Sequence, residues 1–243
     1  MTKAAAARNL ERHLAGNSYP GRGIVIGRNA KKEWIQVYWI MGRSPNSRNR
    51  IFVVEGDVLR TEAADGSQLE DPSLVIYNAM RQSGIRFIVT NGTQTDTIFD
   101  GFQSGDSFVD SMITESHEPD APNFTPRIAG CLAMPPDEGA RMWLSVISAS
   151  PFDPGHSEHR FFRYTEVPAG YGFCVTTYRG DGNPLPPFQG EPLLMPLEGS
   201  ADEIRGTFWD ALDEENRVSL AVKRIAPDGS SSDIAVTNQY GSS

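Results

Sequence analysis

Cysteine is scarce in this sequence of 243 residues, where Cys131 and Cys174 are the two thiols. Two cysteines in a chain of this length do not build the disulfide framework of a small secreted protein, so a reducing, cytoplasmic compartment is the simpler expectation. Both cysteines fall within apolar stretches that we expect to be strands. They are therefore interpreted as inert core thiols and not as nucleophiles.

Positive charge is in deficit, because 22 lysine and arginine residues face 31 aspartate and glutamate residues, for a formal net charge of -9. Nonspecific nucleic-acid binding needs a strongly basic surface, so no nucleic-acid partner is expected. Long apolar runs are lacking as well: no window approaches about 18 uninterrupted apolar residues, and the N-terminus lacks the apolar stretch of a secretory signal. We therefore expect no membrane partner, whereas a small phosphorylated substrate needs only a few local cations.

Several nucleotide and hydrolase motifs are also missing. The sequence contains no G-x-G-x-x-G turn after a first strand, no Walker-A loop and no G-x-S-x-G elbow, which excludes common nucleotide cofactors and the α/β-hydrolase mechanism. His156 and His159 lie close together, but a third and a fourth ligand with clear spacing are lacking. We therefore expect neither a metal ion nor a cofactor.

What is present is the composition of a globular protein, with 39% hydrophobic and 22% charged residues, so a sizeable core is expected. Apolar runs of short length predict strands, and apolar residues on one helical face predict helices. The expected strands span residues 21–27, 33–41, 51–54, 74–78, 86–90, 127–134, 142–149, 160–167, 173–178 and 218–225. The expected helices span residues 3–14, 94–103, 106–115 and 201–213.

The order of these elements favours one α+β domain with two packed sheets over a doubly wound parallel sheet, because no clean βαβ alternation occurs. We expect an N-terminal helical extension at residues 1–20 and a single domain at residues 21–243. Within that domain, the residues 180–200, which are rich in glycine and proline, are expected to cross the surface, and residues 229–243 to form a polar tail.

The polar loop at residues 43–50 holds three guanidinium groups between two expected strands. Arginine can grip a phosphate through paired hydrogen bonds, so Arg43, Arg48 and Arg50 are candidate substrate-binding residues, together with Ser44. A solvated turn explains the same composition about as well, because charged loops are usually exposed.

Two strand ends carry polar groups that could orient a substrate or move a proton. Tyr77 and Asn78 close an apolar run, although a buried core tyrosine is the commoner interpretation of such a residue. Asn91 begins a tight turn into the helix expected at residues 94–103. Unpaired N–H groups there can meet an anion, or they can simply be capped by side chains.

Charged residues also flank a proline-stiffened loop and interrupt a late strand. Glu118, Asp120 and Arg127 surround the loop, and stiff loops hold catalytic acids in place, although a surface salt bridge accounts for these residues equally well. Lys223 shares one face of its expected strand with small residues. It either needs a buried partner or lies harmlessly at a sheet edge, and both interpretations stay open.

Taken together, these segments resemble the archaeal-type IMP cyclohydrolase family, in the same order over roughly residues 20–225. The resembling pieces are Gly21-Arg22-Gly23, Tyr38, Arg43-Ser44, Asn49-Arg50, Ile76-Tyr77-Asn78, the run VTNGTQTD at 89–96, Glu118-Pro119-Asp120 and Thr125-Pro126-Arg127-Ile128. The sequence departs from the family pattern in its extra N-terminal helix, a longer arginine loop and residues 135–200. The resemblance implies a four-layer αββα sandwich of two mostly antiparallel sheets, similar to N-terminal-nucleophile hydrolases but without their nucleophile.

The resemblance also implies an activity in purine biosynthesis, the closure of 5-formamidoimidazole-4-carboxamide ribonucleotide to inosine monophosphate with loss of water. It implies this ribonucleotide as the small-molecule partner and is compatible with a homo-oligomer. For this reaction we expect Tyr77 and Glu118 to transfer protons and Lys223 to stabilise the oxyanion or to act as an acid. The expected substrate-binding residues are Arg43, Ser44, Arg48, Arg50, Asn78, Asn91 and Arg127.

Two alternatives stay open. An amide hydrolase of the same sandwich architecture would need an exposed nucleophile, and Thr2 could serve only if Met1 is removed, which the helix-forming alanines after it disfavour. A non-catalytic purine-nucleotide-binding protein would keep the arginine loop. It would not need Tyr77, Glu118 and Lys223 to converge on one cleft.

Overall fold

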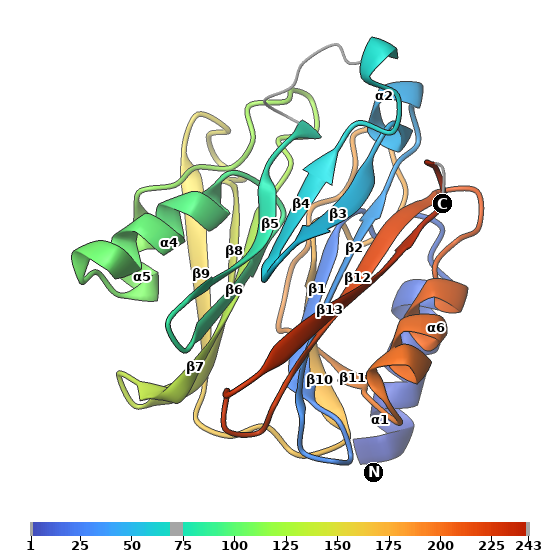
Figure 1. Cartoon of the computed structure of the whole chain (residues 1–243). Coiled ribbons are helices and arrows are strands. Elements are labelled where there is room, and N and C mark those ends of the chain that lie inside the picture. The colour runs from blue at the N-terminus through green and yellow to red at the C-terminus, as the bar shows by residue number, and fades with distance from the viewer. Residues whose placement is uncertain (1, 69–74, 242–243) are drawn as a thin grey trace.

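The computed structural model describes residues 2–68 and 75–241, which form two antiparallel sheets packed face to face (Figure 1). The six-stranded sheet has the order β11-β10-β1-β2-β12-β13, and the seven-stranded sheet has the order β3-β4-β5-β6-β7-β8-β9. The strands are β1 (Gly23–Arg28), β2 (Trp34–Met41), β3 (Ile51–Glu55), β4 (Val58–Glu62), β5 (Asn78–Ser83), β6 (Arg86–Thr90), β7 (Arg127–Asp137), β8 (Ala140–Ala149), β9 (Ser157–Tyr164), β10 (Tyr171–Thr176), β11 (Leu193–Pro196), β12 (Arg217–Ile225) and β13 (Ser232–Asn238). The helices are α1 (Thr2–Leu10), the π-helix η1 (Glu11–Ala15), α2 (Pro45–Arg48), the 3₁₀-helix η2 (Gly66–Gln68), α4 (Gln94–Ser104), α5 (Phe108–Ile113) and α6 (Ala201–Ala211).

The space between the two sheets is filled by apolar side chains from both inner faces. Tyr38 and Ile40 of β2 belong to one buried cluster with Phe87 of β6 and Leu144 of β8. Because side chains alternate along a strand, the other set of β2 residues faces outward, away from this layer. Full burial of each large apolar side chain contributes about 1.5–3 kcal/mol, so this inner layer is a main source of stability.

Helices cover the outer face of each sheet, which gives four layers (Figure 1). Leu14 of η1 and Phe208 of α6 form a buried cluster with Trp39 on the six-stranded sheet. Ile98 of α4 and Met112 of α5 form another on the seven-stranded sheet. The expected α+β sandwich of two mostly antiparallel sheets is therefore confirmed. No helix in the described part of the chain combines the length and the apolar character that crossing a membrane requires.

Strand pairing brings several loops to one end of the sandwich. Gly23 at the start of β1 pairs with Trp39 near the end of β2 and with Thr176 at the end of β10. The residues before β1 therefore lie beside those that follow β2 and β10. In the other sheet, Thr90 at the end of β6 pairs with Ala129 near the start of β7. A hydrogen bond between the segments before β1 and after β6 joins the loops of the two sheets.

Most expected elements are confirmed, with ends shifted by a few residues. The strand expected at 74–78 is wrong for its described part, because Val75 is helical and β5 begins at Asn78, while Leu74 lies outside the described residues. A short apolar run cannot by itself distinguish a helical turn from a strand. The polar tail expected at 229–243 is also wrong, since β13 lies there and packs Ile234 and Val236 against the inner core. Strands β4 and β11 were not predicted.

Candidate active site

A cleft of about 320 Å³ opens where these loops meet. Its lining residues are Tyr19, Arg22, Arg43, Ser44, Ser47, Arg50, Glu118, Asp120, Asn123, Thr125, Tyr178 and Leu185. A smaller cavity of about 50 Å³ shares Tyr19, Arg22, Ser47, Arg50, Thr125 and Tyr178 with it. Larger hollows exist, such as one of about 510 Å³ beside the turn between β5 and β6. The cleft is nevertheless the candidate site, because it gathers three arginines and two carboxylates at a volume that suits a small ligand.

Arg22 and Glu118 form an ion pair in the wall of the cleft. Nη1 of Arg22 lies 2.6 Å from Oε1 of Glu118 and also donates to the carbonyl of Asn91 at 3.1 Å. The two side chains are only 14% and 9% exposed. Burial alone would lower the pKa of Arg22, but the charge of Glu118, with smaller contributions from Tyr77 and Tyr38, raises that pKa well above its usual value. Arg22 therefore stays charged in its buried position.

The turn before β1 fixes the direction of Arg22. Gly21 has a left-handed φ of 74°, and a Cβ atom at this position would lie 2.2 Å from Oγ1 of Thr177. Only glycine tolerates both conditions without strain. The backbone N–H of Arg22 then donates to the same Thr177 oxygen at 3.0 Å. The N–H of Glu118 donates to the carbonyl of Thr125 at 2.9 Å and closes the loop that carries the carboxylate.

Arg50 is a second buried guanidinium of the cleft. Arg50 is only 6% exposed, and its Nε has no hydrogen-bond partner among the described residues. Burial lowers the pKa of Arg50, and the nearby charge of Arg22 lowers it further. A buried cation without a partner is unfavourable by itself, so this arrangement favours an anionic ligand.

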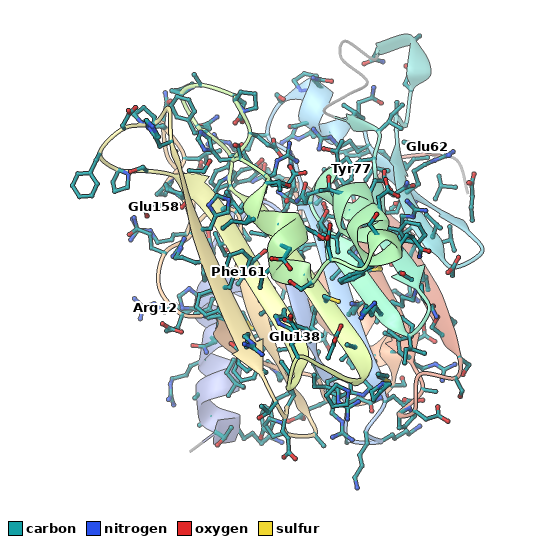
Figure 2. The ribbon with its side chains drawn as sticks, turned by 90° about the vertical axis from the view of Figure 1, so that its left-hand side faces the viewer. Arg12, Glu62, Tyr77, Glu138, Glu158 and Phe161 are labelled. Atoms are coloured by element: carbon teal, nitrogen blue, oxygen red, sulfur yellow. The ribbon has the colours of Figure 1, made fainter. Side chains whose placement is uncertain are left out.

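A pair of buried tyrosines lies next to these charges. The hydroxyl oxygens of Tyr38 and Tyr77 are 2.7 Å apart. Burial, together with the neighbouring Tyr77, raises the pKa of Tyr38 well above its usual value. Tyr77 does not line the cleft, although both phenols lie within electrostatic reach of Arg22. Figure 2 shows Tyr77 toward the same end of the molecule as Glu62, far along the sheet from Glu138.

A chain of short hydrogen bonds forms another part of the wall. The carboxylate of Asp120 accepts the N–H of Thr125 at 2.6 Å and its hydroxyl at 2.5 Å. The same hydroxyl oxygen lies 2.5 Å from the phenol oxygen of Tyr178. The ring of Tyr178 stacks on the ring of Tyr19, with centroids 6.1 Å apart. The Cζ atom of Arg43 lies over the Tyr19 ring, 4.8 Å from its centroid. Burial raises the pKa of Tyr178 to about 12, so its phenol is neutral at physiological pH.

Four of the residues predicted from the sequence line the cleft, namely Arg43, Ser44, Arg50 and Glu118. The structure also explains how their loop is held. Ser44 caps the short helix α2, where its hydroxyl accepts the N–H of Ser47 at 3.2 Å and a proline follows at the first helical position. This cap gives the arginine loop a defined turn, so the loop is not simply a solvated segment.

Two other predicted residues have partners outside the cleft. Arg48 donates from Nε to the carbonyl of Gly42 at 3.0 Å and from Nη2 to Oδ1 of Asn216 at 3.3 Å. Asn78 donates to Oδ1 of Asp96 at 2.9 Å. Neither Arg48 nor Asn78 is among the residues that line the cleft.

Arg127 and Asn91 support the turn that holds Arg22. The guanidinium of Arg127 donates to the carbonyl of Ser116 at 2.8 Å and to Oε1 of Gln94 at 2.6 Å. The amide of Gln94 in turn donates to Oδ1 of Asn91 at 2.8 Å. Asn91 therefore approaches the site through its carbonyl, which accepts from Arg22, and its side chain is used within the turn.

Lys223 lies in the interior between the sheets and not in the cleft. Its Nζ donates to the carbonyl of Asp57 at 3.1 Å and lies 5.4 Å from the centroid of the Phe87 ring. Burial lowers the pKa of Lys223 to about 8. Lys223 pairs with Gln36 of β2, which lies about 17 Å along the strand from Met41 of the smaller cavity. The structure therefore does not bring Lys223 together with the cleft residues.

Arg22, Tyr38 and Tyr178 were given no site role from the sequence, although Arg22 and Tyr38 lie in segments that carry the family resemblance. Arg22 and Tyr178 line the cleft, and Tyr38 forms the hydroxyl pair behind it. The available signals were local: Arg22 stands between two glycines just before a strand, and Tyr178 closes an apolar strand as Tyr77 was expected to do. Their importance comes from partners that are distant in the sequence.

His156, His159 and the candidate nucleophile of the amide-hydrolase alternative lie outside the cleft. Nδ1 of His156 lies 2.9 Å from Oδ2 of Asp153, and Nε2 of His159 lies 2.8 Å from the carbonyl of Glu115. Within residues 2–68 and 75–241, no three histidine, cysteine or acidic side chains gather as metal ligands would. Thr2 lies in α1, which packs against β11, and it does not line the cleft.

Comparisons with known proteins match most of this chain. A family described as "IMP cyclohydrolase-like protein" matches residues 19–229. A protein of Haloquadratum walsbyi named IMP cyclohydrolase is 27% identical over 222 residues, which cover 89% of this chain and 95% of that protein. A protein of the same name from Methanothrix thermoacetophila is 28% identical over 195 residues, with 78% and 85% covered. Another from Methanopyrus kandleri is 29% identical over 164 residues, with 66% and 75% covered.

Proposed function

We propose, because this chain belongs to the IMP cyclohydrolase-like family, that its cleft closes the second ring of a purine nucleotide. The reaction converts 5-formamidoimidazole-4-carboxamide ribonucleotide to inosine monophosphate and water. One structural observation carries the assignment to this cleft. Arg50, a buried cation whose Nε has no hydrogen-bond partner among the described residues, lies close to the Arg22–Glu118 ion pair, in a space that suits a small anionic ligand.

The chemistry sets clear requirements for the site. The carboxamide nitrogen attacks the neighbouring formyl carbon, which forms the new C–N bond and a carbinolamine, and the hydroxyl group then leaves as water. Both reacting groups sit on one imidazole ring, so their proximity is partly supplied and the protein must still orient them. An amide nitrogen is a poor nucleophile because its lone pair is delocalised. A base must therefore accept its proton, and a donor must support the developing oxyanion.

The arginine loop suits the phosphate of the substrate. Arg50 is buried, charged and unsatisfied at Nε, and Arg43 lines the same cleft with its guanidinium over Tyr19. A phosphate can accept hydrogen bonds from both guanidinium groups and pair with the buried charge of Arg50. The contacts of Arg48 outside the cleft, to Gly42 and Asn216, argue against this role for Arg48.

The ion pair suits the reacting groups. We assign the base to Glu118, because it lines the cleft and Arg22 holds its carboxylate in one orientation. Arg22 has further N–H groups that can support the formyl oxygen, the role that the sequence analysis gave to Lys223. Tyr77 stays the second proton-transfer candidate, because its phenol lies within electrostatic reach of Arg22 and is hydrogen-bonded to Tyr38.

We place the reaction in the cytoplasm. Cys131 and Cys174 are free, buried thiols in separate strands. Burial raises the pKa of both thiols, so neither is a reactive thiolate at physiological pH. This arrangement suits a reducing compartment, and a homo-oligomer is equally compatible with the assignment.

An ultraviolet assay tests the proposed function directly. The purified chain is mixed with the formylated ribonucleotide, and the formation of inosine monophosphate is followed with and without a metal chelator. We expect catalytic turnover in both samples. The dephosphorylated nucleoside is the matched control and should react far more slowly, because it lacks the group that Arg50 holds. Saturable binding of the ribonucleotide without any turnover would instead support the non-catalytic nucleotide-binding alternative.

A further inference from the structure

The hydrogen bonds of Asp120, Thr125 and Tyr178 have a fixed direction. Thr125 has one hydroxyl hydrogen, and its oxygen lies 2.5 Å from both the Asp120 carboxylate and the Tyr178 phenol. An ionised carboxylate can only accept, so the Thr125 hydrogen points to Asp120. The Thr125 oxygen then has only lone pairs left for its other neighbour. The phenol hydrogen of Tyr178 must therefore point at Thr125.

This direction decides what Tyr178 offers to a ligand. The hydrogen of a phenol lies near the ring plane, and here it is used within the protein. The phenol oxygen thus presents lone pairs to the cleft that Tyr178 lines. The ring itself cannot turn freely, because it is buried and stacked on Tyr19. The position is an acceptor with a defined orientation.

We propose that Tyr178 recognises a hydrogen-bond donor of the ribonucleotide, and that Asp120 is a positioning residue that sets this polarity through Thr125. The proposal rests on the proposed function and deepens it. A phosphate dianion has no donor, so Tyr178 discriminates against it, whereas ribose hydroxyls and the two amide groups of the substrate are donors. The acceptor Tyr178 and the cations of the arginine loop therefore orient the two ends of one substrate.

The substitution Asp120→Asn reverses this polarity with almost no change of shape. Oδ1 of Asp120 accepts the backbone N–H of Thr125 at 2.6 Å, so an amide nitrogen cannot occupy that position. The amide nitrogen must face the Thr125 hydroxyl and donate to it. The Thr125 hydrogen then turns to Tyr178, and the phenol hydrogen turns into the cleft. The phenol hydrogen of Tyr178 would then face the hydrogen-bond donor of the substrate, and the two would repel each other.

Steady-state kinetics of the ring closure separate the possibilities. Tyr178→Phe removes a neutral hydrogen bond and should lower kcat/KM roughly 3–10-fold, whereas Asp120→Asn creates a donor clash and should lower it roughly 10–100-fold. In a Tyr178→Phe background, Asp120→Asn should add less than about 2-fold, because no phenol is left to reverse. A rise in KM with unchanged kcat indicates a ribose hydroxyl as the partner. A fall in kcat indicates a reacting amide. Asp153→Asn, in an exposed turn where Asp153 accepts from Gly155, is the control and should change neither constant.

An equal loss from Asp120→Asn with and without the phenol would overturn the proposal, since Asp120 would then act only on the fold. Should Asp120→Asn fail to fold, Thr125→Val serves in its place, because it removes the hydroxyl and keeps the backbone N–H. Its loss of roughly 3–10-fold should likewise disappear in the Tyr178→Phe background. A loss that persists there overturns the proposal as well.

A titration of the phenol tests the polarity without any substrate. In Asp120→Asn the Thr125 hydroxyl donates to the phenol oxygen, so the pKa of Tyr178 should fall by about one unit or more, measured by ultraviolet difference against Tyr178→Phe. In Asp120→Asn/Thr125→Val the Thr125 hydroxyl is absent, so only the loss of the Asp120 charge acts on Tyr178. The pKa of Tyr178 should therefore fall less than in Asp120→Asn. An equal fall of the Tyr178 pKa in both variants would contradict the proposed direction of the hydrogen bonds, even if the ribonucleotide is turned over normally. Absence of turnover in the unmodified protein would instead contradict the proposed function. The titration would then still test the direction of the hydrogen bonds between Asp120, Thr125 and Tyr178.

Discussion

Arg22 and Arg50 are neighbouring buried guanidinium groups of one cleft, and among the described residues only Arg22 forms an ion pair with a carboxylate. Glu118 lies 2.6 Å from Arg22, whereas Nε of Arg50 has no partner among the described residues. Burial lowers the pKa of Arg50, and the charge of Arg22 lowers it further. We therefore expect the phosphate of the substrate to pair with Arg50.

Replacing Arg50 by methionine should stabilise the ligand-free protein and weaken its response to anions. The substitution removes an unsatisfied buried cation, so the free energy of unfolding should rise by about 1 kcal/mol. Thermal unfolding is measured with and without inorganic phosphate. We expect phosphate to raise the Tm of the unmodified protein and to leave that of Arg50→Met almost unchanged. Arg48→Met is the control and should keep the full response, and a full response in Arg50→Met would refute the phosphate assignment.

The two hydroxyls of the Tyr38–Tyr77 pair can be separated by matched substitutions. Tyr38→Phe and Tyr77→Phe each break the same hydrogen bond of 2.7 Å, so each should lower stability by about 1 kcal/mol. If Tyr77 carries a proton, its substitution should lower kcat on the order of 10²–10⁴-fold, and that of Tyr38 much less. Steady-state rates and denaturant unfolding of both variants check this expectation. Equal, small losses of kcat would assign both tyrosines to structure alone.

Lys223 should affect stability and not the reaction. Its pKa is about 8 in the folded protein against an ordinary value of 10.5, so the unfolded chain binds the proton more tightly. The resulting destabilisation is fully present below about pH 8 and is lost as the pH rises through about 10.5. Lys223→Met should therefore increase the free energy of unfolding at pH 7 by about 1–3 kcal/mol, with a smaller increase at pH 10.

Denaturant unfolding at the two pH values, with Lys31→Met as a surface control, measures the effect of Lys223. Turnover of Lys223→Met should stay within about 3-fold of the unmodified protein, because the side chain lies away from the cleft. A loss of several orders of magnitude in kcat with intact folding would return Lys223 to the catalytic role that the sequence suggested.

Much of the fold followed from local patterns. The strand at residues 86–90 was predicted with its observed bounds, because a continuous apolar run ends there at Asn91-Gly92. Strand β13 was missed because its sequence is mostly polar, and it exists only through its pairing with β12 at the edge of the sheet. Tertiary pairing of this kind is not encoded in the residues of the strand itself.

The site was predicted less completely, for a related reason. The composition of residues 43–50 indicated a cationic loop, but only the packing of the two sheets shows that Arg50 points into the cleft and Arg48 away from it. The alternation along β12 left open whether Lys223 is buried or lies at a sheet edge, and the structure shows that it is buried. Its distance from the cleft depends on the register between distant strands, which the sequence pattern does not contain.

The central claim is that ring closure occurs at the Arg22–Glu118 pair. The most direct measurement is kcat for the formation of inosine monophosphate by Glu118→Gln, beside the exposed control Glu158→Gln, with both proteins shown to be folded by thermal unfolding. The account predicts a fall of kcat on the order of 10²–10⁴-fold for Glu118→Gln and an unchanged kcat for the control. A folded Glu118→Gln protein with the kcat of the unmodified chain would contradict it.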